Sequence, residues 1–437
     1  MDNPTFGPRL RALRLERGLS QAALAEGGLS TGYLSRLESG ARQPTERVLV
    51  HLSARLGVPL SAFEGDDRPR ALSLAQVLAA VTSAMGTGAG GAQPVADDGV
   101  AEVLQEALAA EESQDSALRW QALWLLAGIR SQQSRYDEEN TLLAELVSLS
   151  DELASQELRA RGRTRRSRCL RLLGDTGAAR RLAQEAHELA AELPVDDRAA
   201  ALHALISAEA EAGVLGEARA HADELCALTE DARGKRLVEA LWASATVHIR
   251  QGDHANAQRA LDRALEELDS HRDLTLWVRL RLAAASLHLQ TAQPRTDRVR
   301  AVIAEVEPVV TRVGSELHQQ QLRVLLAQLA FAEDRLEEAA ALCAAVAADD
   351  LLLSFRDRIR FQALRGSLML LDGRVEAGTA LMHDLAGQAQ QARNVELAAE
   401  VWRGLAKTLA KVYGLPAAAD PAVEPGPQLT GQNTGAG

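Results

Sequence analysis

Short polar breaks recur at regular intervals along most of this chain, and each is followed by an alanine-rich helical pattern. Between the breaks, apolar residues repeat with a period of about 3.6, and the alternation typical of strands is absent. The spacing is about 39 or 40 residues, which is long enough for one helical hairpin. This pattern predicts hairpins that stack into a superhelical α-solenoid. Seven breaks lie near Asn140, Ala178, Ala218, Ala257, Arg298, Ala339 and Ala377.

The breaks also resemble those of a known repeat family. A glycine or aspartate turn followed by an alanine, as in GDTGAA, GVLGEA and GDHANA, is similar to the tetratricopeptide repeat with lengthened helices. Most of that family's aromatic pattern is missing. The resemblance implies an all-α repeat domain over residues 100–413, with the first helix of each pair lining a concave surface. Residues 414–437 carry several prolines and glycines, and we expect a disordered tail there.

The first 65 residues follow a different plan, with short helices close together. Ser20 and Ser30 each stand before a helix, where a side-chain oxygen can accept a hydrogen bond from a free backbone amide. Gly27-Gly28 provides a tight change of direction between them. Two such helices match a helix-turn-helix, although an ordinary helical hairpin of a bundle shares this pattern. Five helices are expected: one over Phe6–Arg17, one that begins after Ser20, one that begins after Ser30, one from Thr45 with Leu56 on its apolar side, and a last short turn over Leu60–Phe63.

The charge of the chain is unevenly divided. The formal net charge is −12, which is unusual for a nucleic-acid binder. Residues 1–65, however, contain eight arginines and six acidic residues, so this part carries +2 and the remainder about −14. A weakly basic head on an acidic body favours local, oriented contact with DNA over general affinity.

Four segments of the head carry a specific resemblance. LSQAALAE, YLSRLESG, RQPT and LGVPLSAF, in this order, are similar to the phage-repressor-like (XRE-type) DNA-binding domain over residues 6–65. The resemblance implies double-stranded DNA as the partner and an interior ion pair between Arg14 and Glu38. It also implies that Arg36 reaches a guanine edge and that Tyr33 contacts the backbone or packs beneath the next helix. The remaining implied DNA contacts are Gln21 with a phosphate, Ser30, Thr31 and Gly32 at the groove floor, and Arg42 and Gln43 with phosphates.

One departure from the family pattern lies between the two helices of the motif. The interval from Gln21 to Gly40 is one residue shorter than the common spacing, and the deletion falls at the glycines, so we expect a tighter turn. Beyond the head, residues 66–99 are assigned to a linker. Within it, Ala71–Met85 predicts a short helix and Gly86–Gly99 a flexible joint.

Several function classes lack the sequence signals they need. No apolar run approaches the roughly 18 residues of a membrane span, and no signal peptide is visible, so a cytoplasmic protein that is nucleoid-associated when bound to DNA is expected. Neither a metal-ligand spacing nor a catalytic constellation is present, so we expect no metal, cofactor or enzymatic activity. Three scattered cysteines, Cys169, Cys226 and Cys343, are interpreted as buried thiols.

The strongest charge cluster of the repeat region is RARGRTRRSR. It places Arg161, Arg165 and Arg168 on one helix face, and this face could bind an anionic effector or a peptide carboxylate. An ordinary solvated face paired with nearby acids is the alternative.

Two functions remain open at this point. A phage-repressor-like head on tetratricopeptide-like repeats resembles the cytoplasmic quorum-sensing regulators of Gram-positive bacteria that bind small signalling peptides. That resemblance implies a transcriptional regulator, acting as a homodimer, whose repeats sense a peptide or other small effector. The alternative is a tetratricopeptide-type interaction scaffold with a secondary DNA-binding head.

Overall fold

The computed structural model describes residues 6–58, 63, 73–86, 98–110, 115–271, 273–291, 294–346 and 351–415. Over these residues all regular secondary structure is helical, which confirms the all-α class. The chain divides into two compact units, residues 1–77 and 78–437. Helix α5 (Leu74–Gly86) spans this division and corresponds to the short helix expected before the joint. Most of the joint, the turn of helix at residues 60–62 and the tail from residue 416 lie outside the described residues.

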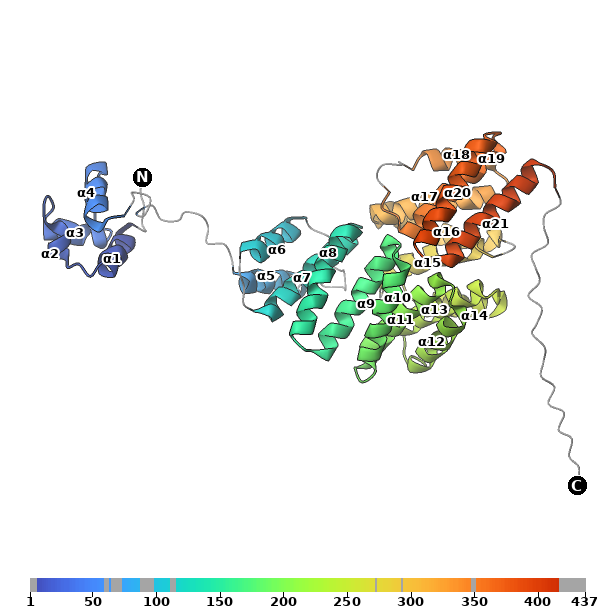
Figure 1. The fold of residues 1–437 in the computed structure, drawn as a ribbon, viewed down its shortest axis with the longest axis horizontal. Helices are drawn as coiled ribbons and strands as arrows, with labels where there is room; N and C mark the ends of the chain where they lie inside the picture. Colours follow the sequence, from blue (N-terminus) through green and yellow to red (C-terminus); the bar gives the residue numbers. More distant parts are fainter. Residues whose placement is uncertain are drawn as a thin grey trace, which may run out of the picture. The chain divides into compact units, whose positions relative to one another are not determined.

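The first unit contains four described helices around one apolar core (Figure 1). Leu10, Leu24, Leu34, Leu37 and Leu52 are fully buried and come from all four helices. Each helix contributes few such residues, so none could form a core alone, and the short elements fold only as a set. The helices are α1 (Phe6–Glu16), α2 (Gln21–Ala25), α3 (Thr31–Glu38) and α4 (Glu46–Leu56).

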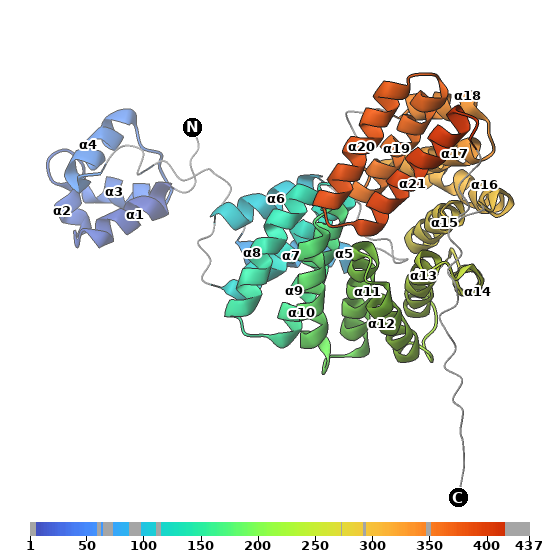
Figure 2. The same cartoon turned by 45° about the vertical axis from the view of Figure 1, so that its right-hand side comes forward.

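The second unit is built from antiparallel helix pairs. After α6 (Asp98–Ala110), seven pairs follow one another and α21 (Val395–Val412) ends the series. First helices of successive pairs lie side by side, as α9 does with α11 and α11 with α13 (Figure 2). The pairs are α7 (Ser116–Gln132) with α8 (Tyr136–Glu152), α9 (Gln156–Leu173) with α10 (Thr176–Ala190), α11 (Val195–Ala212) with α12 (Leu215–Leu228), α13 (Lys235–Arg250) with α14 (His254–Glu267), α15 (Leu274–Leu289) with α16 (Thr296–Val313), α17 (Glu316–Ala332) with α18 (Leu336–Ala344), and α19 (Phe355–Leu371) with α20 (Val375–Gln391).

A buried position recurs in every pair and explains the alanine after each break. The fourth residue of each second helix is buried, and it is small in five of the seven pairs. At Gly378, an added Cβ would lie 2.8 Å from Leu370 Cγ of the partner helix, so the two helices approach too closely for a side chain. In two pairs the buried residue comes one position after the predicted Ala178 and Ala377. The seven residues are Glu139, Ala179, Ala218, Ala257, Val299, Ala339 and Gly378.

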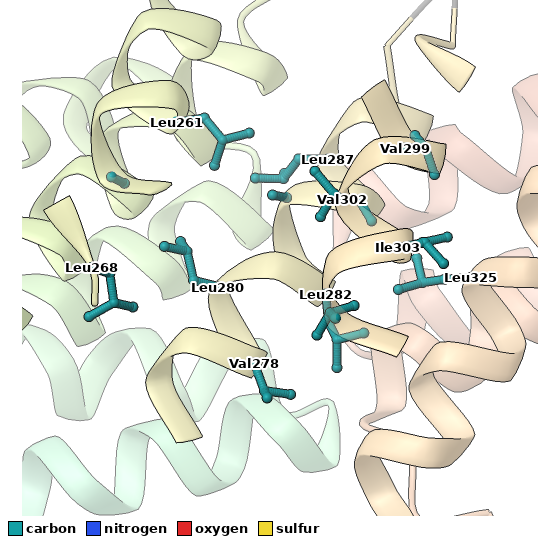
Figure 3. Packing of buried hydrophobic residues seen from close by; sticks show 14 of the residues in the cluster. Leu261, Leu268, Val278, Leu280, Leu282, Leu287, Val299, Val302, Ile303 and Leu325 are labelled. Carbon is teal, nitrogen blue, oxygen red and sulfur yellow. The ribbon is translucent and has the colours of Figure 1, made fainter. Parts of the chain in front are cut away.

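The core of the solenoid continues from pair to pair. The largest cluster of buried apolar side chains runs from α13 to α17 and includes Leu261, Leu280, Ile303 and Leu325 (Figure 3). Each of these pairs therefore covers the apolar face of its neighbour, and adjacent pairs stabilise one another. Of the three thiols, Cys169 and Cys343 are buried and Cys226 is partly buried.

The last helices return to the second and third pairs. Helix α19 contacts α9, and α21 contacts α11, so residues far apart in sequence meet here (Figures 1 and 2). Gly174, which ends α9 with φ +95°, lies directly against the ring of Phe355 at the start of α19. A Cβ at Gly174 would be 2.5 Å from Phe355 Cγ, which is too close for any side chain. The position therefore requires glycine for two reasons, its positive φ and the lack of space. The solenoid is thus closed by a contact between its seventh and second pairs.

Candidate nucleic-acid interface

The exposed face of α3 is the first candidate site. Ser20 and Ser30 accept hydrogen bonds from the amides of Ala23 (3.1 Å) and Tyr33 (3.2 Å), and so begin α2 and α3. On α3, Leu34 and Leu37 are fully buried. The opposite face of the helix is exposed and consists of Thr31, Gly32, Ser35, Arg36 and Ser39. This polar face with one arginine fits the recognition helix of a helix-turn-helix, which needs an apolar inner side and a polar outer side.

The recognition helix is anchored from beneath by Glu38. Arg14 donates from Nε to Glu38 Oε1 (2.6 Å) and from Nη2 to Oε2 (3.0 Å), and its Nη1 donates to the carbonyl of Leu19 (2.8 Å). Both side chains are more than 90% buried. Burial opposes ionisation of Glu38, but the hydrogen bonds from Arg14 and Gln21 outweigh it and lower the pKa of the carboxyl. The pair ties α1 to the end of α3 and so fixes the orientation of the exposed face.

Gln21 contributes to the same anchor. The resemblance implies a phosphate contact for this residue, whereas its Nε2 donates to Glu38 Oε2 (2.8 Å). This bond holds the first residue of α2 against the last residue of α3. The side chain is half-buried, so Gln21 has a positioning role in the free protein.

Arg36, Arg42 and Tyr33 form a connected set at the edge of α3. Arg36 donates from Nε to the carbonyl of Gly32 (3.1 Å), which lays the guanidinium along the exposed face. The guanidinium of Arg42 lies 4.9 Å from the ring centre of Tyr33, a cation–π distance. Tyr33 is half-buried and packs on the core. Arg42 and Gln43 are both exposed in the following loop.

The turn between α2 and α3 uses glycine as expected. Gly27 has φ +95°, a conformation that other residues rarely adopt. Helix α2 is only five residues long and ends at Ala25. Gly32 lies on the exposed face with no atom within 4 Å of an added Cβ, so its backbone is open to close approach.

Ser35 is a candidate that the sequence analysis missed. It is exposed and stands four residues after Thr31, and Ser39 follows at the same interval. Residues at i and i+4 share one face of a helix, so this spacing was available in the sequence once Thr31 had been chosen.

The three arginines of α9 do not form one uniform site. Arg161 is paired with Asp197 (2.6 Å) and Glu157 (2.6 Å). Arg165 is paired with Glu139 (3.4 Å) and lies 4.7 Å from the ring centre of Trp124. Their charges are therefore balanced by local partners, in agreement with the alternative of an ordinary paired face.

Arg168 differs from its two neighbours. Its Nη2 donates to the carbonyl of Ala200 (3.0 Å), and no ion pair joins it to any described acidic residue. Arg168 is exposed to solvent, and desolvation by its surroundings lowers the pKa of its guanidinium. The charge of Glu239 raises this pKa, whereas the charges of Arg279, three pairs further along on α15, and of Arg171 lower it. Burial, followed by the charges of Arg168, Arg171 and Arg279, lowers the pKa of His203 to about 3 and keeps its imidazole neutral.

The described part of the chain lacks the features of two other kinds of site. No group of three histidine, cysteine, aspartate or glutamate residues there is arranged to hold a metal ion. None of the described helices combines the length and apolar character that crossing a membrane requires.

The head matches known DNA-binding proteins. Residues 10–63 fit the helix-turn-helix family model. The transcriptional regulator PrpR of Mycobacterium tuberculosis is 45% identical over 65 residues, which are 15% of this chain and 13% of that protein. The immunity repressor of Bacillus phage phi105 is 38% identical over 64 residues, 14% of this chain and 44% of the repressor. The chain thus spans well under two thirds of these relatives, and the likeness is confined to the head.

The chain also matches a solved structure in fold. A Rap protein, solved in complex with Competence and Sporulation Factor, aligns over 94% of this chain and 98% of its own, with a TM-score of 0.50 and 11% identity. At this identity the match concerns the fold alone, a tetratricopeptide-like stack of helix pairs. The chain therefore consists of an XRE-type helix-turn-helix domain followed by a tetratricopeptide-like α-solenoid.

Proposed function

We propose that this protein is a DNA-binding transcriptional regulator that reads its operator with α3. The observation that carries the proposal is the exposed face of α3, on which Thr31, Ser35 and Arg36 lie above a core of buried leucines. Arginine is the side chain best suited to bind guanine through two hydrogen bonds, and Arg36 is the arginine of this face. The identity of the head to regulators and to a phage repressor supports the same function.

Arg36→Ala tests the proposal on the genomic sites that the protein enriches. Loss of a bidentate base contact should weaken operator binding by about 1–3 kcal/mol and relax the preference at one base pair. Arg17→Ala is the matched control, because it removes an exposed arginine of the head just after α1. Binding is measured on an operator and on variants at each position. Unchanged affinity and preference in Arg36→Ala would remove this residue from the recognition surface.

We further propose that the regulator acts as a homodimer. One head of this size covers little DNA, and paired heads would meet half-sites about one helical turn apart. Sedimentation equilibrium of the full chain, with and without an operator, tests this state. A monomer that binds a single half-site with full affinity would contradict it.

The solenoid is proposed to sense a peptide or other small effector on its inner surface. Arg168 is the support for this, because it is exposed and, unlike Arg161 and Arg165, forms no ion pair with a described acidic residue. The Rap protein was solved with a factor bound, which supports a ligand-binding role for such a fold. Arg168→Gln should make transcription of the regulated gene constant across growth conditions while operator affinity of the purified protein is unchanged. Equal loss of both would assign Arg168 a structural role.

A further inference from the structure

A second charged cluster lies where the solenoid closes, and its first member, Arg171, follows Arg168 by one turn of α9. Two glutamates form its centre, one on α11 and one on α21. Four arginines from α9, α13 and α19 surround them. The six residues are Arg171, Glu211, Arg250, Arg356, Arg360 and Glu400.

Part of this cluster is well paired. Arg171 Nη1 donates to Glu211 Oε1 (2.8 Å) and so joins α9 to α11. Arg360 donates from Nε to Glu400 Oε1 and from Nη2 to Oε2, both at 2.8 Å. The same Nη2 donates to Gln290 Oε1 at the end of α15 (2.6 Å). Glu400 thus accepts hydrogen bonds at both oxygens, whereas Glu211 accepts one, at Oε1.

The other two arginines are left without adequate partners. Arg356 comes no closer than 3.8 Å to Glu211 and 3.7 Å to Glu400, although its side chain is only 11% exposed. No hydrogen bond or ion pair joins the side chain of Arg250 to any described residue. Three buried nitrogens have no hydrogen-bond partner, namely Arg171 Nε, Arg250 Nη1 and Arg356 Nη1. A buried, unsatisfied donor is costly, and a charged one more so, which is why such groups point to a ligand.

The charge balance indicates what kind of ligand fits. Four arginines surround two glutamates, which leaves two positive charges uncompensated within the cluster. The charges of Asp357 and Glu396 favour the ionised forms of Arg356 and Arg250 respectively, but neither carboxylate forms an ion pair with these arginines; Asp357 accepts a hydrogen bond from Ser354 at the start of α19. Burial, followed by the charge of Arg356, lowers the pKa of Arg250 to about 9, and the charges of Glu211 and Glu396 offset this only in part. The side chain of Glu400 is 34% exposed, so the cluster is open to solvent on one side.

We infer that this cluster binds a doubly charged oxyanion of the phosphate type, with Arg250 and Arg356 as its donors. The planar guanidinium matches two oxygens of a phosphate, and two arginines can hold three oxygens of one group. A single carboxylate would leave one positive charge and part of the donors unmatched. The bound anion would connect α13 of the fourth pair with α19 of the seventh and so fasten the closure of the solenoid.

The test is thermal unfolding of the full chain in inorganic phosphate, with chloride adjusted to keep ionic strength constant. All five tryptophans lie between residues 120 and 402, so their fluorescence reports on the solenoid. A ligand of the folded state should raise Tm with the logarithm of the phosphate concentration once this exceeds Kd, by roughly 5 °C at 100 times Kd. A rise that is linear in phosphate concentration would instead be the general salting-out effect of phosphate and would overturn the site.

Arg250→Gln separates these outcomes. Because the side chain of Arg250 is a buried charge without a hydrogen bond or ion pair to any described residue, the variant should unfold at the same or a higher Tm than the wild type in phosphate-free buffer. It should also lose the logarithmic rise of Tm with phosphate. Arg358→Gln, at an exposed arginine of α19, is the control and should keep the response. An equal response in Arg250→Gln and wild type, or a clear loss of stability without phosphate, would overturn the inference.

Calorimetric titration identifies the source of the anion. Free phosphate and a small phosphate monoester, such as glycerol 3-phosphate, are titrated separately, and stronger binding of the monoester would assign the site to a phosphorylated metabolite. Sulfate, a doubly charged oxyanion of the same shape, should compete with phosphate. Binding of malonate with no binding of phosphate would contradict the proposed ligand class.

Discussion

The two units each bury a group of arginines and glutamates, and the two groups differ in balance. In the head, Arg14 and Glu38 neutralise one another through two hydrogen bonds, and the remaining arginine nitrogen donates to the carbonyl of Leu19. In the closure of the solenoid, Glu211 and Glu400 face twice as many arginines, and buried donors are left over. A pair with equal positive and negative charge needs no further partner, whereas a cluster with more arginines than glutamates can bind an additional anion.

The difference also concerns connectivity. The Arg14–Glu38 pair joins two residues that are 24 positions apart in the sequence, within a small domain. The bond from Arg360 to Gln290 spans 70 residues, and other contacts of the closure join the second pair to the seventh. Removing a group from the head should therefore unfold it locally, while changes in the closure should open a unit whose pairs remain folded.

The largest effect is expected from Glu38→Ala. It leaves Arg14 buried without its carboxylate and removes the acceptor of Gln21, so the head should lose about 3–5 kcal/mol of stability. Tryptophan fluorescence does not report on the head, because all five tryptophans lie outside it. Calorimetry of the full chain is therefore used to follow the unfolding transition of the head. Operator binding should be lost at the same temperature as that transition.

A matched control for this prediction is Glu26→Ala. Glu26 forms an exposed ion pair with Arg55 at 3.4 Å, and such pairs contribute only about 0–1 kcal/mol. The double variant Arg14→Met with Glu38→Leu replaces both charges by apolar side chains and should recover much of the loss. A similar cost for Glu26→Ala and Glu38→Ala would show that burial of the pair is unimportant.

The next effect concerns the closure contact at Gly174. Gly174→Ala places a Cβ on the ring of Phe355 and adopts an unfavourable φ of +95°. Gly373→Ala is the control, because Gly373 has a φ of +82° and no atom within 4 Å of an added Cβ. The conformation should cost each variant about 1–2 kcal/mol, and the overlap should cost Gly174→Ala roughly 1–3 kcal/mol more.

Urea unfolding followed by tryptophan fluorescence measures these costs. Small-angle scattering should show a larger radius of gyration for Gly174→Ala alone, because only this variant disturbs the contact between the second and seventh pairs. Equal unfolding free energies and equal radii for the two variants would mean that the closure tolerates a side chain at this point.

The sequence was sufficient for features that depend on neighbouring residues. The hairpin period, the capping serines and the exposed position of Arg36 all follow from local spacing, and the structure has them at those places. The closure could not be predicted, because it depends on the sum of small rotations between successive pairs. Gly174 has the sequence features of an ordinary helix end, and nothing near Arg250 indicates that Arg356 will lie beside it. The pairing of Gln21 with Glu38 was missed because both residues already had other expected roles.

The smallest expected effect is a difference between the two units in how their free energies of unfolding depend on pH. Burial, followed by the charges of Arg168, Arg171 and Arg279, lowers the pKa of His203 to about 3, while an unfolded histidine titrates near 6.5. The unfolded solenoid therefore binds a proton that the folded one rejects. Stability is complete above about pH 6.5 and falls with decreasing pH, by at most about 1.4 kcal/mol per pH unit.

The stability that Glu38 contributes to the head is lost over a different pH range. Its pKa is lowered in the folded state, so the stability it contributes is present above the ordinary carboxyl pKa and is lost only as pH falls through the folded value. Between pH 6.5 and 5, tryptophan-detected unfolding should consequently become easier while the head transition is unchanged. His203→Gln should reduce the pH dependence of the solenoid in this range and leave the part that comes from His187, His288 and His318, whose pKa values burial also lowers. His254→Gln, a variant at the first residue of α14, should not reduce it. An unaltered slope in His203→Gln would show that another group controls the acid response and that the arginines around His203 do not hold it neutral.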